Sequence, residues 1–361
     1  MVRLMGQSVT RKCGHDSALQ ETSPQHGSQD PRVSQPVCPC FTLERLNPNL
    51  QAWTERLRSG DPRALARAIS AVENRAPESP QLLKAAFSYS GKARILGLTG
   101  APGAGKSTLV DQLARHYRRA GQTLGIIAVD PTSPYTGGAI LGDRIRMQEH
   151  HADSGIYIRS MATRGSLGGL ARTTADVATV LDASGRNLIL IETVGVGQDE
   201  VDIVRVADVT VVILVPGMGD DVQTIKAGIM EIADIFVINK SDREGAENVE
   251  REIRAMQSLA TRTDGWTPPV IKTVATTGAG VEDLVAAIAG YETYLQKQNL
   301  VLKRSVQNWQ GRLIEMLRDA MLEKARVALG DGQVERYAEE IAEHKRDPYT
   351  LVEEIVGKAG N

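Results

Sequence analysis

Gly100-Ala101-Pro102-Gly103-Ala104-Gly105-Lys106-Ser107 is the stretch of sequence that decides the fold. It matches G-x-x-x-x-G-K-[ST] at every fixed position. The glycines allow a tight turn that points backbone N–H groups inward, and a helix beginning at Lys106 adds the positive end of its dipole. We expect Lys106 to reach the β- and γ-phosphates of a nucleotide and the Ser107 hydroxyl to bind magnesium. The motif predicts a phosphate-binding loop, with Thr108 as its last nucleotide-binding residue.

The flanks of this loop have the context that the motif requires. The apolar run Ile95-Leu96-Gly97-Leu98 precedes it, and Thr108–Arg119 reads as a helix. Further short apolar runs cover residues 124–129, 187–191, 209–215, 235–238 and 270–274. Such runs alternating with helices are typical of a parallel sheet buried on both faces. We therefore predict an α/β fold with a mostly parallel central sheet and helices on both of its faces.

Polar residues stand where several of these strands end. Asp130, Glu192 and Asn239 each close an apolar run, and ligands of such sheets bind at the carboxyl ends of the strands. Asp130 and Glu192 are candidate magnesium partners, directly or through water, and could also act in catalysis. Asp143 could join them only if the intervening loop folds back.

The sequence Asn239-Lys240-Ser241-Asp242 follows one predicted strand and indicates a guanine reader. The Asp242 carboxylate can accept hydrogen bonds from N1–H and N2–H of guanine, a donor pair that adenine lacks. Lys240 can lay its alkyl stem along the base. Ala275 and Thr276, after the last strand, are weaker candidates for a further base-contacting loop.

Glycine-rich segments near the phosphate loop are candidates for nucleotide-dependent movement. The backbone N–H of Gly195 could sense the γ-phosphate. Residues 130–138 are rich in turn-forming types. Residues 161–172 carry Arg164 and Arg172, which could contact phosphate or a partner, although exposed arginines are more often only solvated. Gln198 is a candidate for orienting the attacking water, but its spacing identifies it only loosely.

The regions outside the sheet are predicted to be helical or disordered. We expect a disordered tail over residues 1–42, an N-terminal helical region over 43–90, the nucleotide domain over 91–295 and a C-terminal helical region over 296–361. An apolar stripe marks the first C-terminal helix: Val306, Trp309, Leu313, Met316, Leu317 and Ala320. It suits packing on the nucleotide domain and dimerisation equally well.

Composition excludes several classes of protein. The formal net charge of −2 shows no basic excess for binding nucleic acid, and no apolar run is long enough to span a membrane. The three cysteines, Cys13, Cys38 and Cys40, all lie in the tail, which suits a reducing cytoplasmic setting. A mitochondrial transit peptide is a weaker interpretation of this tail, as is a metal site at the last two cysteines.

Taken together, the motifs resemble the MeaB/ArgK/MMAA family of methylmalonyl-CoA mutase-associated P-loop GTPases. The resemblance is carried by 100–107, 130–133, 142–147, 163–169, 192–198 and 239–242, and it extends over about residues 43–361. Within it Lys226 matches a lysine in a further switch segment that responds to the partner, and Asp130, Asp143 and Glu192 match the acidic residues around magnesium and the switches.

This resemblance implies a homodimeric chaperone, with the C-terminal helices contributing to the dimer. It implies slow GTP hydrolysis, with GDP as product, that is stimulated by an adenosylcobalamin-dependent acyl-CoA mutase. Such proteins gate the delivery of adenosylcobalamin from an adenosyltransferase to the mutase and protect the mutase from inactivation. Methylmalonyl-CoA mutase is the partner that the resemblance favours, although related mutases use similar chaperones.

Three alternatives remain at this point. A nickel-handling GTPase should carry Cys and His ligands beside its switches, and here His150 and His151 stand without thiols. A scaffold that binds nucleotide without hydrolysis would not need Lys106 and Ser107 together with the strand-end acids. A small-molecule kinase would share the phosphate loop but not the guanine reader.

Overall fold

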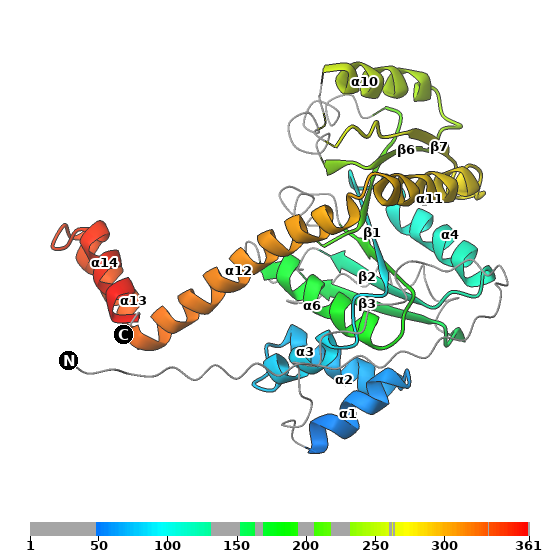
Figure 1. The fold of residues 1–361 in the computed structure, drawn as a ribbon. Helices are drawn as coiled ribbons and strands as arrows, with labels where there is room; N and C mark the ends of the chain where they lie inside the picture. The colour runs from blue at the N-terminus through cyan, green and yellow to red at the C-terminus, as the bar shows by residue number, and fades with distance from the viewer. Residues whose placement is uncertain are drawn as a thin grey trace, which may run out of the picture. The chain divides into compact units, whose positions relative to one another are not determined.

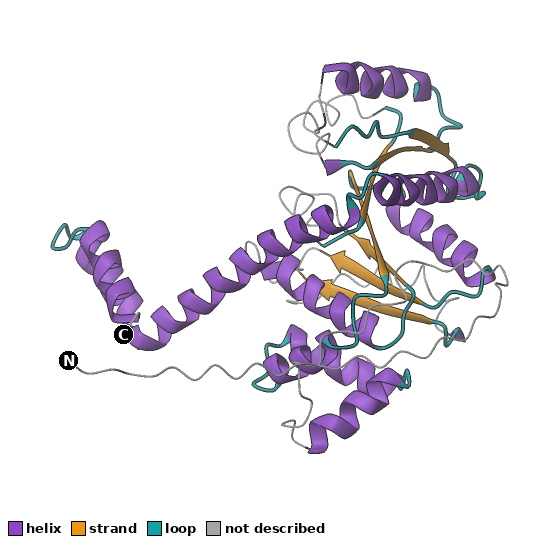
Figure 2. Cartoon of the chain, viewed as in Figure 1, coloured by secondary structure: helices purple, strands orange, loops and turns teal. Residues whose placement is uncertain are grey.

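The computed structural model describes residues 48–130, 152–162, 169–193, 206–217, 232–259, 262, 264–330 and 332–359. At its centre lies a seven-stranded sheet in the order β3-β2-β4-β1-β5-β6-β7 (Figure 1; Figure 2). Every neighbouring pair in it is parallel. The strands are β1 Arg94–Gly100, β2 Leu124–Asp130, β3 Ile156–Ala162, β4 Leu188–Glu192, β5 Val209–Leu214, β6 Ile235–Asn239 and β7 Val270–Thr273. The predicted α/β fold with a parallel central sheet is confirmed.

The strand β3 was not among the apolar runs identified in the sequence. It pairs in parallel with β2 and lies at the edge of the sheet. Because no strand of the described residues lies along one of its long sides, it need not be apolar throughout, and Arg159 and Ser160 interrupt its pattern. Arg159 forms an ion pair with Glu73 on a helix that packs nearby. A polar edge strand of this kind gives little periodic signal.

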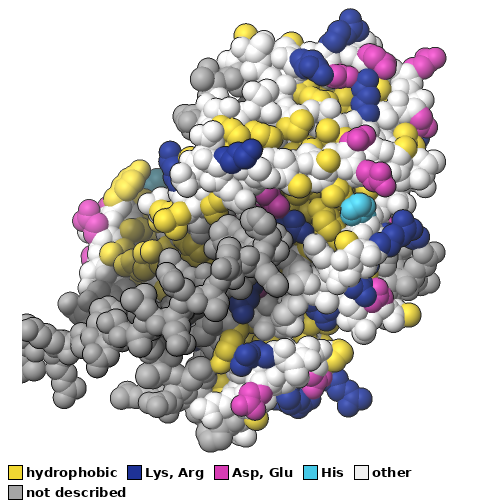
Figure 3. Space-filling model, turned by 45° about the vertical axis from the view of Figure 1, so that its right-hand side comes forward, with side chains coloured by type: hydrophobic (Ala, Val, Ile, Leu, Met, Phe, Trp, Pro, Cys, Tyr) yellow, Lys and Arg dark blue, Asp and Glu magenta, His cyan; other side chains and the backbone are white. Residues whose placement is uncertain are grey.

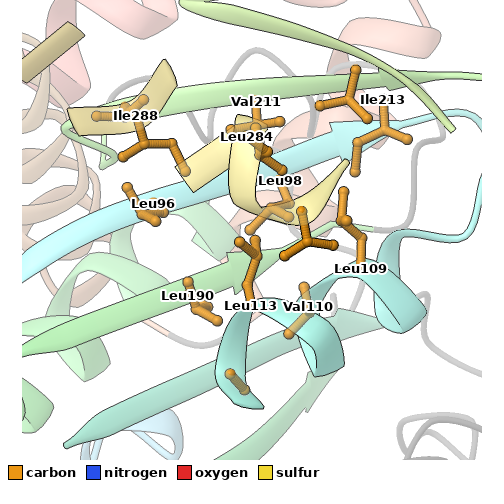
Figure 4. Packing of buried hydrophobic residues seen from close by; sticks show 14 of the residues in the cluster. Leu96, Leu98, Leu109, Val110, Leu113, Leu190, Val211, Ile213, Leu284 and Ile288 are labelled. Carbon is orange, nitrogen blue, oxygen red and sulfur yellow. The ribbon is translucent and has the colours of Figure 1, made fainter. Parts of the chain in front are cut away.

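Helices cover both faces of the sheet. With the labels of Figure 1 they are α1 Pro48–Arg58, α2 Pro62–Glu73, α3 Ser79–Phe87, α4 Lys106–Arg119, α6 Gly169–Ala183, α10 Ala246–Leu259, α11 Val281–Lys297, α12 Val301–Leu329, α13 Gln333–Ala342 and α14 Pro348–Ala359. α4 and α11 pack on one face, where leucines of β1 meet those of both helices (Figure 4). α6 packs on the other face over β2 and β4, and α2 and α3 pack on α6.

The N-terminal helices belong to the same packed core as the sheet. Asp61 caps α2 by accepting hydrogen bonds from the backbone N–H groups of Arg63 (2.8 Å) and Ala64 (3.3 Å), and Pro62 takes the first helical position, where its missing N–H costs nothing. Leu65 and Ile69 are fully buried and join Ile127 and Ile189 of the sheet in one apolar cluster. Burial of these side chains therefore holds α2 against the sheet domain.

α12 contacts the sheet domain mainly through its polar face. None of its residues is fully buried, and its partly buried positions include Arg304, Asn308, Arg312 and Asp319. Most of its large apolar side chains are exposed: Val301, Leu302, Val306, Trp309, Leu313, Ile314, Leu317, Met321, Leu322 and Val327. Trp309 is the least exposed of them and meets the ring of Phe87 edge-on at 5.5 Å. Most of the predicted apolar stripe thus faces outward rather than toward the sheet.

The surface of the described residues carries charges of both signs. On the face drawn in Figure 3, Lys and Arg side chains are interspersed with Asp and Glu, and hydrophobic side chains gather between them. Among the helices that the structure describes, none combines the length and the apolar character needed to cross a membrane.

Candidate nucleotide-binding site

The carboxyl ends of the parallel strands bring the predicted site residues to one edge of the sheet. In the register of the sheet, Glu192 at the end of β4 lies opposite Leu98 of β1 and Ala128 of β2. The phosphate loop leaves β1 two residues after Leu98, and Asp130 ends β2 two residues after Ala128. The fold therefore brings the strand-end residues together at this edge, as predicted.

The phosphate loop turns tightly between β1 and α4, and two of its glycines have no room for a side chain. Gly100 has φ +144°, and a Cβ there would lie 2.1 Å from the carbonyl oxygen of Ile213 in β5. Gly105 has φ +89° and precedes the first residue of α4, and its Cβ would lie 2.4 Å from Nδ2 of Asn239. These close approaches explain why both positions require glycine: a side chain would collide with neighbouring atoms, and the backbone conformation also favours glycine.

Lys106 lies folded back over this loop. Its side chain is buried, and its Nζ donates hydrogen bonds to the carbonyl oxygens of Gly100 (2.8 Å) and Ala101 (3.0 Å). The ammonium group is thus held at the loop, beside the N-terminus of α4, which is a place that favours an anion. This position suits a lysine that binds the phosphates of a nucleotide.

Ser107 and Glu192 bring two oxygen ligands together beside Lys106. The Ser107 hydroxyl donates a hydrogen bond of 2.5 Å to Oε1 of Glu192, and the Glu192 side chain is buried. A hydroxyl and a carboxylate next to a phosphate loop are the hard oxygen donors that magnesium takes in such sites, where it keeps several waters. The residues present therefore fit a magnesium ion. Asp130 ends β2 at the same edge, and its side chain lies outside the described part of the chain.

Asn239 connects the segment that we predict to read guanine with the phosphate loop. Its Nδ2 donates to the carbonyl oxygen of Ala104 at 2.7 Å, and its Oδ1 accepts from the backbone N–H of Ala275 at 3.0 Å and from the hydroxyl of Thr273 at 3.2 Å. Three segments that are far apart in the sequence thus meet at one buried side chain. Thr273 was not predicted as a site residue, and its only signal is a hydroxyl near the end of an apolar run.

Lys240 adds a second connection between these segments. It takes the left-handed backbone conformation, with φ +56°, and its Nζ donates to the carbonyl oxygen of Gly103 at 2.7 Å. Asp242, two residues on, is exposed, as is Thr276 on the neighbouring loop. The Asp242 carboxylate is therefore accessible to a base, while the backbone around it is held by Asn239 and Lys240.

Some predicted site residues lie outside the described part of the chain: Asp143, Gly195, Lys226, Gln198 and Arg164. Arg172 is described and contacts other side chains. Its Nη1 donates to Asp319 of α12 at 2.8 Å, and its Nε lies 3.9 Å from Asp176. The structure thus gives this arginine protein partners rather than placing it at the phosphate loop.

Comparison with known proteins identifies a single family. The family described as "Methylmalonyl Co-A mutase-associated GTPase MeaB" matches residues 65–329. A Pyrococcus abyssi protein with a provisional GTPase name is 46% identical over 310 residues, which are 84% of this chain and 96% of that protein. GTPase ArgK of Escherichia coli is 39% identical over 248 residues, covering 66% of this chain and 75% of that protein.

A mouse relative and a solved structure agree with this assignment. The mouse protein named methylmalonic aciduria type A homolog, mitochondrial, is 39% identical over 227 residues, which are 61% of this chain and 55% of that protein. The crystal structure of a protein named LAO/AO transport system kinase aligns with a TM-score of 0.64 at 27% identity, covering 88% of this chain and 99% of that one.

Proposed function

Because the chain belongs to the MeaB family of methylmalonyl-CoA mutase-associated GTPases and is therefore a GTP hydrolase, we propose that it is a chaperone of an acyl-CoA mutase. In this proposal GTP binding and hydrolysis gate the delivery of adenosylcobalamin to methylmalonyl-CoA mutase, or to a related mutase, and protect that enzyme. An adenosyltransferase would supply the cofactor. The family description and the name of the mouse relative support this choice of partner.

The observation that carries the nucleotide chemistry is the link that Asn239 makes between the phosphate loop and the guanine reader. It holds the two recognition elements in one arrangement, so that a guanine nucleotide can occupy both. The Asp242 carboxylate would accept hydrogen bonds from N1–H and N2–H of guanine, with Ala275 and Thr276 beside the base. ATP offers no matching donor pair, so Asp242 would remain unpaired against adenine.

Hydrolysis would proceed by in-line attack of water on the γ-phosphate. Lys106 would exchange the carbonyls of Gly100 and Ala101 for phosphate oxygens, and backbone N–H groups of the phosphate loop would stabilise the charge that develops. A magnesium ion held by Ser107 and Glu192, with Asp130 and Asp143 as further partners, would supply charge neutralisation at the β- and γ-phosphates. We assign Gly195 to sensing the γ-phosphate and Lys226 to a switch that responds to the partner.

We expect hydrolysis to be slow in the isolated protein. No residue of the described chain stands out as the group that orients the attacking water, and GTPases of this kind reach full activity when a partner completes the site. The mutase would be that partner.

The outward apolar face of α12 supports a homodimer. Its exposed side chains, among them Leu313, Ile314 and Leu317, form a contiguous stripe on a 29-residue helix. Exposed apolar stripes of this size mark interaction surfaces. A second copy of the same helix offers a complementary apolar surface and would close a two-fold interface.

The test is GTP hydrolysis by the purified protein, alone and with methylmalonyl-CoA mutase from the same organism, with ATP as the competing substrate and the Lys106→Ala variant as a blank. We expect a slow, GTP-specific rate that rises with the mutase. Hydrolysis that the mutase leaves unchanged would remove this mutase as the partner while keeping the GTPase. Equal use of ATP would contradict the role of Asp242 and favour a kinase, which is the activity for which the solved relative is named.

A further inference from the structure

α12 crosses the sheet domain from the amino edge of the strands to the carboxyl edge. Near its start, Arg304 donates to Asp234, the residue directly before β6. Fifteen residues later Asp319 accepts from Arg172, the fourth residue of α6. At 1.5 Å per residue these contacts are about 22 Å apart, roughly the length of a strand in the sheet.

The contact between Asp319 and Arg172 lies on the nucleotide side of the sheet. β3 and β2 run parallel, with Ala162 opposite Asp130 at their carboxyl ends. α6 begins at Gly169, seven residues after β3 ends, so its first turn starts from the edge where Ser107 and Glu192 meet. Arg172 in that first turn is therefore a point of contact between α12 and α6 close to the nucleotide edge.

Charged side chains make this contact specific. Arg312 donates to Asp176 at 2.7 Å, and Asp176 is only 8% exposed. Arg172 lies between Asp319, at 2.8 Å, and Asp176, at 3.9 Å. The energy of a partly desolvated ion pair depends on its geometry much more strongly than the energy of an apolar contact does. Breaking such a pair leaves a charge without its partner. A small shift of α6 would therefore change how α12 is held.

We propose that the ion pairs between α6 and α12, above all Arg172–Asp319, couple the nucleotide state of the GTP site to the position of α12. When the γ-phosphate end of the site changes, α6 shifts, and α12 follows because its polar face is attached to α6 by directional ion pairs. The outward apolar face of α12 moves with it. This coupling goes beyond the chaperone function and needs only GTP binding, not the mutase.

Coupling of this kind is reciprocal. Whatever occupies the apolar face of α12 and favours one position of the helix would favour the corresponding nucleotide by the same factor. Through the ion pairs, binding of a partner to the surface of α12 would change the nucleotide affinity of the GTP site without any direct contact between the two.

The first test is amide hydrogen exchange of the full chain saturated with GDP or with a non-hydrolysable GTP analogue at equal protein concentration. We expect exchange in residues 301–329 and in the first turn of α6 to differ between the two nucleotides. Identical exchange of α12 in both states would overturn the proposal.

The second test uses Asp319→Asn, with Arg318→Gln as the matched control. Arg318 is on the same helix and pairs with Glu315 within α12. We expect Asp319→Asn to change the ratio of GTP-analogue to GDP affinity by at least about fivefold and to remove the nucleotide dependence of α12 exchange. The control should leave both unchanged.

The conservative variant Asp319→Glu keeps the test decisive if Asp319→Asn folds poorly. It retains a carboxylate opposite Arg172 and leaves the Arg172–Asp176 contact unchanged, so it should retain the wild-type affinity ratio. If Asp319→Asn weakens both nucleotides equally, or if Asp319→Glu retains thermal stability but not the affinity ratio, the contact is merely structural and the coupling is wrong.

Discussion

Two glycines of the phosphate loop share a backbone conformation but differ in their surroundings. Gly103 has φ +75° and Gly105 has φ +89°. A Cβ on Gly103 would meet nothing within 4 Å, whereas one on Gly105 would lie 2.4 Å from Nδ2 of Asn239. Substituting Gly103 therefore tests backbone strain alone. Substituting Gly105 tests backbone strain together with a steric conflict with Asn239, which links the loop to the proposed guanine reader.

We predict that Gly105→Ala abolishes measurable nucleotide binding, because the methyl group displaces Asn239 and with it the contact to Ala104. Gly103→Ala should cost about 1–2 kcal/mol of stability through its left-handed conformation alone and should retain binding. Titration with a fluorescent guanine nucleotide, together with thermal melts, measures both effects. Equal loss of affinity in the two variants would contradict the role of Asn239.

The exposed carboxylate of Asp242 gives a second prediction at this scale. Asp242→Asn replaces one acceptor oxygen by an N–H₂ donor, which faces a donor of guanine. We expect GTP affinity to fall at least about 100-fold, because a site that pairs with a donor rejects a ligand it cannot satisfy, and xanthosine triphosphate to become the better ligand. Competition binding checks this, and unchanged preference for GTP would exclude Asp242 as the base reader.

Among the elements, α12 and β6 meet at a buried cluster around Asp234. Its side chain is 1% exposed and accepts from Arg304 at 3.1 Å, Arg262 at 3.2 Å and the backbone N–H of Thr210 at 2.9 Å. Burial and the negative charge of Asp234 both raise the pKa of neighbouring Tyr291 above its ordinary value. This cluster attaches the C-terminal helix to the strand that ends in Asn239.

We predict that Asp234→Ala lowers the free energy of unfolding by about 3–5 kcal/mol, because it leaves the partly buried Arg304 without its counter-ion. Arg262 keeps its second partner, Asp264. The matched control is Arg254→Gln, which removes an exposed pair with Glu250 on α10 and should change stability by less than about 1 kcal/mol. Denaturant unfolding of both variants with GDP bound provides the comparison. A loss no larger than that of the control would show that Asp234 does not hold α12.

At the scale of the whole molecule, the orientation of α12 determines which surface a partner meets. Leu313 and Leu317 are 54% and 55% exposed on its outer face, and α14 packs on this helix. An apolar surface of this extent is costly to leave in water. A second copy that covers it would make dimerisation part of the stability of the protein.

We predict that Leu313→Glu/Leu317→Glu makes the protein monomeric at concentrations where the wild type is dimeric. GTP binding should persist, because neither residue contacts the nucleotide site. Sedimentation equilibrium measures the oligomeric state, with Leu259→Glu on α10, another exposed leucine at 87%, as the control. A wild type that is monomeric in this assay, or a variant that stays dimeric, would argue against α12 as the interface.

The local patterns of the sequence were sufficient for the phosphate loop and most of the strands. In each case the signal comes from residues that are close along the chain, such as the glycines and Lys106 of the loop. The carboxyl-edge placement of Glu192 and Asn239 also followed from the sequence, because parallel strands end at one edge.

What the tertiary structure alone decided depends on contacts between distant residues. The edge strand β3 is interrupted by Arg159 and Ser160 and gives little periodic signal. The bridge from Asn239 to Ala104 and Ala275 joins segments more than 30 residues apart. The apolar stripe of α12 was visible in the sequence, but the direction it faces was not. A periodic pattern identifies the apolar side of a helix, while what lies against each side is set by long-range ion pairs such as Arg312–Asp176.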